Sequence, residues 1–575
     1  MFSGSEVTVE KQLRLAASLL GIVLWLGLWS ASSGASTYVV YIPLDDPIYQ
    51  ELDTLNGLGY LKTYLSEIRP ISRIEAARLT LEAQANLENR QDPVGLSMVD
   101  ELRDELATEI DWLEHNRVDE LPNLLTPVQR IELQYVYSQG PHRTWQTSPP
   151  NSSQASGINA EEGTPLLPNN DGLPTSQGSN EIARWQGWGG AASFLTLYAE
   201  GAAAGPLDHG VYGPPDGASR FSLLGAEGVA SLGNTVISFG QEEMWWGTGS
   251  FGALTFSNNA PPFPAFRIQN LHPTLLPWFL RYLGQFRYQV FFGELDSYRY
   301  FSHPWIDGET FAFKPLPNFE FGLTHAMLFG GRHNDNYTFP GFLGRATGFA
   351  TGSISNGNTH QEGGIWLKFY FPRLRDAQLY QEICGEDNLS FEIPGIGKFL
   401  PFLAVSYQGG FYLPRLTKDG KTDLRFEYVI TEPNYSMHDD TLYFDYRNMD
   451  MGDAIGPNAT EVDIQLGRWL DLRRKLTGDV FYTEEAPNYQ SNFYYPAEFY
   501  PYPLAKEHSG GVALDLFELP THLGGFQELL AGWHLRAAIE YARALNYQQG
   551  ATSVRALVSV TGTFDLTGRR SFFSW

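Results

Sequence analysis

The stretch that decides the fold lies at residues 533–566 and contains two alternating segments, WHLRAAIEYA at 533–542 and VRALVSVTGTFDL at 554–566. Successive side chains of an extended strand point to opposite faces, so each segment has one mainly apolar face and one face with charged and hydroxyl groups. Each segment is about ten residues long, which is the length of a tilted strand that crosses a bilayer. Because one hairpin is not stable alone, the pattern predicts further strands.

The same two-residue alternation recurs at 286–292, 319–324, 365–371 and 424–431. A soluble β-sandwich has this period too, so alternation alone does not decide which solvent covers the apolar face. An export signal, the terminal aromatic Trp575 and the charges on the polar face favour lipid, because a Lys or Arg facing lipid at the midplane costs about 2–4 kcal/mol. The expected lumen-lining side chains are Arg287, Lys368, Arg425, Glu427, Arg536, Glu540 and Arg555.

The N-terminal residues have the features of an export signal. Lys11 and Arg14 precede the apolar stretch 15–29, and residues 33–35, SGA, match a small-x-small cleavage site. We therefore expect residues 1–35 to be a signal peptide. A retained membrane anchor is the alternative, which the shortness of the stretch disfavours.

The periodicity of apolar residues divides the remaining chain into two parts. Apolar residues recur at helical spacing at 48–58, 74–85 and 98–113, which predicts a small helical domain over 36–120. Alternation starts at 131 and predicts one barrel of about 18 antiparallel strands over 131–575, an even number being typical of outer-membrane barrels. Residues 138–181 are rich in Pro, Gly, Ser and Asn and are expected to form a flexible loop or linker.

Charge and cysteine content exclude several classes of function. The net charge is −26, so duplex nucleic acid is not an expected partner. The single cysteine, Cys384, excludes an internal disulfide framework and a zinc site with several thiolates. The chain has no phosphate-binding loop and no dinucleotide fingerprint, and no spacing typical of a calcium loop supports a site at its His and Asp residues. We expect neither a cofactor nor a metal.

Several motifs occur in a fixed order along the chain. The most distinctive is FGQEEMWWGTG at 239–249, which is followed by SNNAP at 257–261 and by Phe266-Arg267; GED at 385–387 and GDAIG at 452–456 come later, and PLDD at 43–46 and RIEAA at 73–77 come earlier. Together these motifs resemble the capsule assembly Wzi family of bacterial outer-membrane proteins. The chain departs from that family at 138–181 and at 487–503.

The resemblance implies a barrel of about eighteen strands in the cell outer membrane with a small helical domain in the periplasm. It also implies a non-enzymatic, lectin-like protein that binds or anchors capsular or other surface polysaccharide. The motif residues that become candidates for the glycan site are Trp245, Trp246, Arg267, Glu386, Asp387 and Asp453. Aromatic faces suit sugar rings, but the tryptophan pair could instead pack a loop inside the barrel, and Arg267 could form an ion pair in the lumen.

The sequence also bears on three functions other than glycan binding. Glycoside hydrolysis needs two opposed carboxylates, and adjacent strand residues such as Glu242 and Glu243 point to opposite faces. A porin-like transport channel is the alternative function, and the mixed signs of the lumen charges predict no clear ion selectivity. A second alternative is a structural barrel whose helical domain binds a peptidoglycan-linked polymer.

Overall fold

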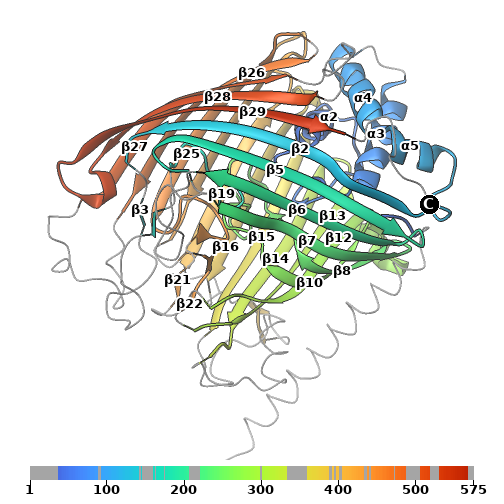
Figure 1. Ribbon diagram of the computed structural model, residues 1–575, viewed down its shortest axis with the longest axis horizontal. Coiled ribbons are helices and arrows are strands. Elements are labelled where there is room, and N and C mark those ends of the chain that lie inside the picture. Colours follow the sequence, from blue (N-terminus) through green and yellow to red (C-terminus); the bar gives the residue numbers. More distant parts are fainter. Residues whose placement is uncertain are drawn as a thin grey trace, which may run out of the picture.

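The computed structural model describes most of residues 36–566, with gaps of more than ten residues at 146–159, 206–219, 333–358, 487–504 and 519–529 and with shorter ones elsewhere, as at 89–91 and within 387–403 and 433–448. The expected signal peptide, residues 1–35, lies outside the described residues. The dominant element is a closed antiparallel barrel that surrounds the N-terminal segment, and a group of helices lies at one end of it (Figure 1).

Eighteen long strands close the barrel, with β2 pairing both β5 and β29, and the two-residue β11 (Thr274–Leu275) lies beside β12. This confirms the predicted fold class. The strands in chain order are β2 (Leu124–Gln139), β5 (Gly178–Ala191), β6 (Leu195–Gly205), β7 (Arg220–Leu232), β8 (Thr235–Gln241), β10 (Pro264–Asn270), β12 (Gln285–Glu294), β13 (Trp305–Leu316), β14 (Phe319–Phe329), β15 (Thr359–Phe371), β16 (Ala377–Glu386), β19 (Ala404–Leu413), β20 (Thr422–Ile430), β25 (Ala459–Trp469), β26 (Arg474–Glu485), β27 (Glu507–Glu518), β28 (Leu530–Arg543) and β29 (Thr552–Asp565).

The observed boundaries differ from the expected ones where the local pattern is weak. The first strand begins at Leu124 rather than 131, because a register shift between Thr126 and Arg130 interrupts the alternation of β2. The expected loop 138–181 is shorter than predicted, since β5 begins at Gly178 and residues 164–173 are described inside the barrel.

Four helices form the N-terminal domain: α2 (Pro47–Gly57), α3 (Arg73–Leu87), α4 (Pro93–Glu105) and α5 (Ala107–Glu114). Side chains of Asp46, Ser72 and Asp92 accept hydrogen bonds from the first backbone N–H groups of α2, α3 and α4, which fixes where each helix begins. The single helix expected over 98–113 is broken at Leu106, whose φ and ψ leave the helical range. Within the described residues, no helix is long and apolar enough to cross a membrane.

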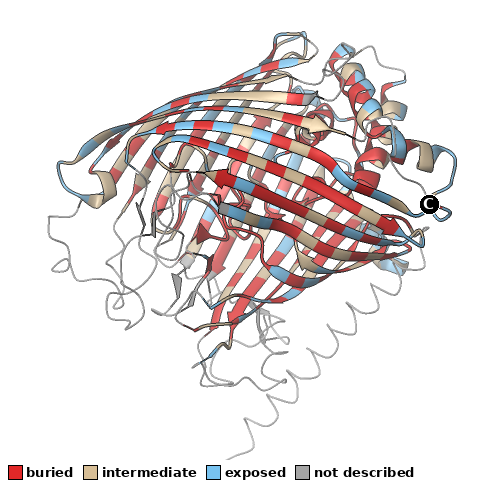
Figure 2. Ribbon diagram, viewed as in Figure 1, coloured by how far each residue is buried: buried red, intermediate tan, exposed pale blue. Residues whose placement is uncertain are grey.

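The two faces of the barrel wall differ as the alternation predicts (Figure 2). Large apolar side chains such as Val480, Leu514 and Tyr541 are about half exposed, whereas Glu540 and Arg555 on the other face are almost completely buried. The charged groups of Glu540 and Arg555 are therefore directed into the lumen, where protein rather than lipid surrounds them, and the apolar side chains of these last strands are directed outward.

The connections alternate between the two ends of the barrel. The helical domain precedes β2, so the end where β2 starts, here called the helix end, also carries the turns 192–194, 233–234, 271–284, 317–318 and 372–376. The segments 140–177, 242–263 and 431–458 connect strands at the opposite end, and each has described residues inside the lumen. Segments from both ends therefore meet within the barrel.

Candidate functional site: the filled lumen

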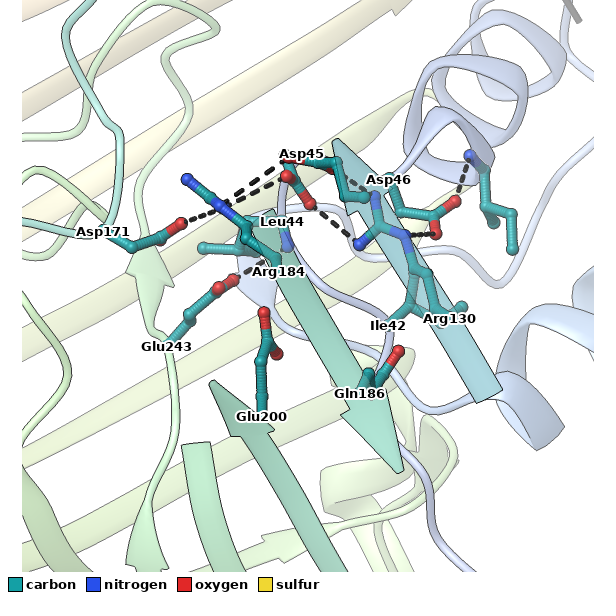
Figure 3. A network of polar contacts seen from close by, with 12 residues as sticks. Ile42, Leu44, Asp45, Asp46, Arg130, Asp171, Arg184, Gln186, Glu200 and Glu243 are labelled. Carbon is teal, nitrogen blue, oxygen red and sulfur yellow. Dashed lines mark hydrogen bonds and ion pairs between the residues drawn. The ribbon is translucent and has the colours of Figure 1, made fainter. Parts of the chain in front are cut away.

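The motif PLDD at 43–46 lies inside the barrel, where it joins the wall to two inward segments (Figure 3). Asp45 accepts hydrogen bonds from Arg130 of β2 (3.1 Å) and Arg184 of β5 (3.2 Å), and Arg184 also donates to Asp171 (2.6 Å). Burial alone would raise the pKa of Asp45, but these two guanidinium groups hold it below its ordinary value. The network ties the N-terminal segment to residue 171, which belongs to the segment from the opposite end.

The tryptophan motif lies in the same interior. The two-residue strand β9 (Trp245–Trp246) pairs with β1 (Ile68–Arg69) of the N-terminal domain, and the Gly247 N–H donates to the Glu67 carbonyl (3.1 Å). Trp246 is fully buried, and its indole N–H donates to Gln289 of β12 (2.6 Å). Its ring contacts Phe256 and Phe291, with centroids 5.0 and 5.3 Å away.

Several lumen charges hold this inner loop, 242–263, in place. The backbone N–H of Ser250 donates to Glu427 of β20 (2.9 Å), and that of Thr248 donates to Glu382 of β16 (2.9 Å). Arg267 of β10 donates to Glu227 of β7 (3.0 Å) and to the carbonyl of Glu242 (3.2 Å), the first residue of the loop. These contacts satisfy backbone groups that a short irregular segment would otherwise leave unpaired in the interior.

The other predicted lumen residues also form hydrogen bonds, ion pairs or ring contacts. Arg287 donates to the Pro70 carbonyl, Lys368 pairs with Glu67, and Arg425 lies over the Tyr412 ring. Arg536 pairs with Asp515 of β27, and Arg555 pairs with Glu540 (3.2 Å). Alternation predicted that these residues line the lumen. The partners of Arg287 and Lys368 are more than 200 residues away in the chain and could not be read from spacing, whereas those of Arg425, Arg536 and Arg555 lie on the adjacent strand.

The remaining motif residues have different positions. Asp453 is buried in the motif GDAIG: its backbone N–H donates to the Tyr435 hydroxyl, and its carboxylate accepts from the Ile455 N–H (3.0 Å). This segment contacts the inner loop, since the Ser257 N–H donates to the Met451 carbonyl. The described residues include the backbone of Glu386 at the end of β16, but not its side chain and not Asp387.

A polar cavity of about 130 Å³ remains between the N-terminal domain and the inner loop. Its lining includes Trp245, Arg69, Lys368, Arg425 and Asp53. Trp246 does not line it, so the two tryptophans have different surroundings. Sequence reasoning missed Arg130, Arg184 and Asp45 as the central network, because the two arginines are 85 and 139 residues from Asp45 in the chain.

No group of three or more His, Cys, Asp or Glu side chains within the described part of the chain is arranged to hold a metal ion. The chemistry of the interior is that of ion pairs and hydrogen bonds between segments. A closed barrel with an apolar outer face and a lumen filled from both ends defines a plugged outer-membrane β-barrel.

The comparisons with known proteins agree with an outer-membrane β-barrel. The family model described as capsule assembly protein Wzi matches residues 147–554, and the chain belongs to that family of outer-membrane proteins. The chain is similar to an uncharacterized 55.8 kDa protein in the cps region of Klebsiella pneumoniae, with 30% identity over 185 residues, or 32% of this chain. That match spans only about a third of the relative's length, 36%.

Among solved structures, the chain is similar to Wzi of Escherichia coli, described as an outer-membrane protein involved in group 1 capsule assembly and as a carbohydrate-binding β-barrel. The TM-score is 0.60 at 18% identity, over 92% of this chain and 100% of that chain. This similarity supports the fold. The outer-membrane protein OprD of Pseudomonas aeruginosa has a TM-score of 0.41 at 10% identity, over 77% of this chain and 94% of that chain.

Proposed function

We propose that this protein binds capsular or related surface polysaccharide at the end of the barrel opposite the helical domain, without catalysing a reaction. Family membership supports a role in capsule assembly, and the related Escherichia coli barrel is described as carbohydrate-binding. In this proposal the helix end faces the periplasm, and the longer connections face the cell exterior.

The observation that carries the proposal is the occupied lumen. Residues 43–72 from one end are joined to 242–263 from the other by the β1–β9 pairing. They are joined to Asp171 of the segment 140–177 through Arg184. A transport channel needs a continuous wet path, whereas a surface receptor needs a rigid frame for its outer segments. The ion pairs across the lumen favour the second function over the porin-like alternative.

The motif residues have two roles in this proposal. Trp246, Arg267 and Asp453 are buried and hydrogen-bonded, so we assign them to holding the inner loop rather than to sugar contact. Trp245 borders the polar cavity together with Arg425, so we keep it as a candidate for glycan contact. Glycan contact by Glu386 and Asp387 stays a prediction.

Deletion of the gene in the source cell tests the proposal. We expect the amount of cell-attached polysaccharide to fall and the amount released into the medium to rise, with total synthesis unchanged. Unchanged attachment would exclude the anchoring role. Planar-bilayer recordings test the channel alternative, which predicts large conductance steps for the purified protein, whereas a plugged receptor gives none.

A further inference from the structure

The turn between β10 and β12, residues 271–284, departs from the other turns at the helix end. It contains β11 and the 3₁₀ helix η1 (Trp278–Leu283), whereas neighbouring turns such as 233–234 and 317–318 have two residues. No residue of η1 is buried, and Trp278, Phe279 and Tyr282 are 70–76% exposed. These are the three most exposed large apolar side chains among the described residues.

The turn folds back onto the outer wall of the barrel. Phe286 and Tyr288 alternate with the lumen residues Arg287 and Gln289, so they belong to the outward face. Both are nevertheless almost completely buried, because Leu276, Leu280 and Leu283 of the turn pack against them. One side of the turn therefore covers the barrel wall, and the other side displays its aromatic rings away from it.

The position of the turn on the barrel wall indicates its depth in the membrane. Outward aromatic side chains form a band at the helix end of β12 to β15: Phe286 contacts Phe313, which contacts Phe321, and Phe319 contacts Phe369, with ring centroids 4.9–5.0 Å apart. Such a band marks the boundary between hydrocarbon and headgroups in outer-membrane barrels. The turn continues this band, so its exposed rings stand at the same depth.

The composition of the exposed side fits that boundary. Trp and Tyr are enriched there because their rings are apolar and their N–H and O–H groups are polar. Arg281 is exposed beside them, with its guanidinium 5.4 Å from the Tyr282 ring centroid, and can meet a phosphate group. Trp278 has a φ of 56°, which bulky residues rarely adopt. Such strained backbone is often found at functional positions, so it favours a functional role for this turn.

We propose that residues 274–283 form an interfacial membrane anchor: Trp278, Phe279 and Tyr282 insert at the headgroup–acyl boundary of the phospholipid leaflet at the helix end, and Arg281 binds phosphate headgroups. The anchor fixes the depth and tilt of the barrel on the side where β10 and β12 meet. It does not depend on glycan binding, because it concerns the lipid-facing wall alone, but it rests on the periplasmic orientation of the helix end given with the proposed function.

A fluorescent probe at single cysteines tests this anchor. In a Cys384→Ala background, Phe279→Cys and Tyr282→Cys each receive an environment-sensitive fluorophore, and Leu96→Cys on α4, which is exposed but distant from the band, is the matched control. The purified full chain is reconstituted into vesicles of phosphatidylethanolamine and phosphatidylglycerol, with and without nitroxide-labelled phospholipid. Two anchor positions are labelled, so that one variant still tests the proposal if the other does not fold.

The expected result is a blue-shifted emission and a strong loss of intensity with nitroxide lipid at position 279 or 282, and neither change at position 96. Equal, water-like emission at all positions would overturn the proposal, because the rings would then stand in water rather than in the headgroup–acyl boundary. Equal quenching at all positions would overturn it as well, because the turn would then be no more embedded than the helical domain.

Discussion

The ion pair between Lys368 and Glu67 gives the strongest prediction about the filled lumen. Lys368 projects from the wall strand β15, and its Nζ lies 2.9 Å from Glu67 Oε1 and 3.0 Å from Ser66 Oγ in the N-terminal domain. Both side chains are buried, with 9% and 1% exposure. Burial would raise the pKa of Glu67, and Lys368 instead keeps it lowered.

Replacing Lys368 by Met leaves this carboxyl group without its cation in the interior. Loss of one partner of a buried pair costs about 3–5 kcal/mol, and each ~1.4 kcal/mol is a factor of ten in an equilibrium constant. We therefore expect the population in which residues 60–72 detach from the wall to rise on the order of a hundredfold or more. The double variant K368M/E67Q removes both charges and should recover much of the loss.

Hydrogen exchange followed by mass spectrometry measures this detachment directly. Amides of residues 60–72 should exchange much faster in K368M, and those of β26 and β27 should not change. K506M is the matched control, because the pair of Lys506 with Glu484 is largely exposed and is worth at most about 1 kcal/mol. Wild-type exchange rates at 60–72 in K368M would refute the view that ion pairs hold the domain in the lumen.

Three further predictions concern the helical domain, the lipid face and the aromatic cluster. Burial and the nearby Asp104 raise the pKa of Glu101 to about 7, although Arg473 opposes this shift. The folded state therefore favours the protonated form of Glu101. The free energy of unfolding should fall as pH rises from about 4.5 to 7, by at most about 3 kcal/mol. Thermal melts of E101Q should lack this part of the pH dependence, and an identical pH profile would contradict it. V480K puts a charge on the outward face in the middle of β26 and should reduce the stability of the barrel in bilayers by about 2–4 kcal/mol; urea titration in vesicles compares it with V480A, and equal midpoints would contradict the assignment of faces. W246A removes a fully buried ring and should cost about 3–5 kcal/mol, more than W245A at the edge of the cavity; near-ultraviolet circular dichroism melts measure both, and equal losses would count against the different surroundings assigned to the two rings.

The barrel could be predicted from sequence because its cause is local. Alternation at residues 533–542 and 554–566 reports directly which side chains share the apolar face, and the pairs Glu540–Arg555 and Leu535–Val560 lie in the register that this alternation requires. The strand count followed from the length of the alternating region, 131–575, and from the even number of strands typical of outer-membrane barrels.

The site could be predicted only in part, because its contacts are long-range. Trp246 meets Gln289 and Phe291 through a loop that turns into the barrel, and nothing in the local sequence specifies that direction. The alternation also could not indicate the outward-packed turn at 271–284, since its covering residues Leu276, Leu280 and Leu283 follow no strand period. Where irregular backbone enters the interior, tertiary hydrogen bonds decide the structure.

Binding of purified capsular polysaccharide from the source cell to the detergent-solubilised full chain tests the central claim most directly. Isothermal titration or surface-immobilised polymer would measure it, with a neutral dextran as the control polymer. The account predicts saturable binding of the cell's own polymer, none of dextran, and no shortening of the polymer after prolonged incubation. Absence of binding, or cleavage of the polymer, would contradict it.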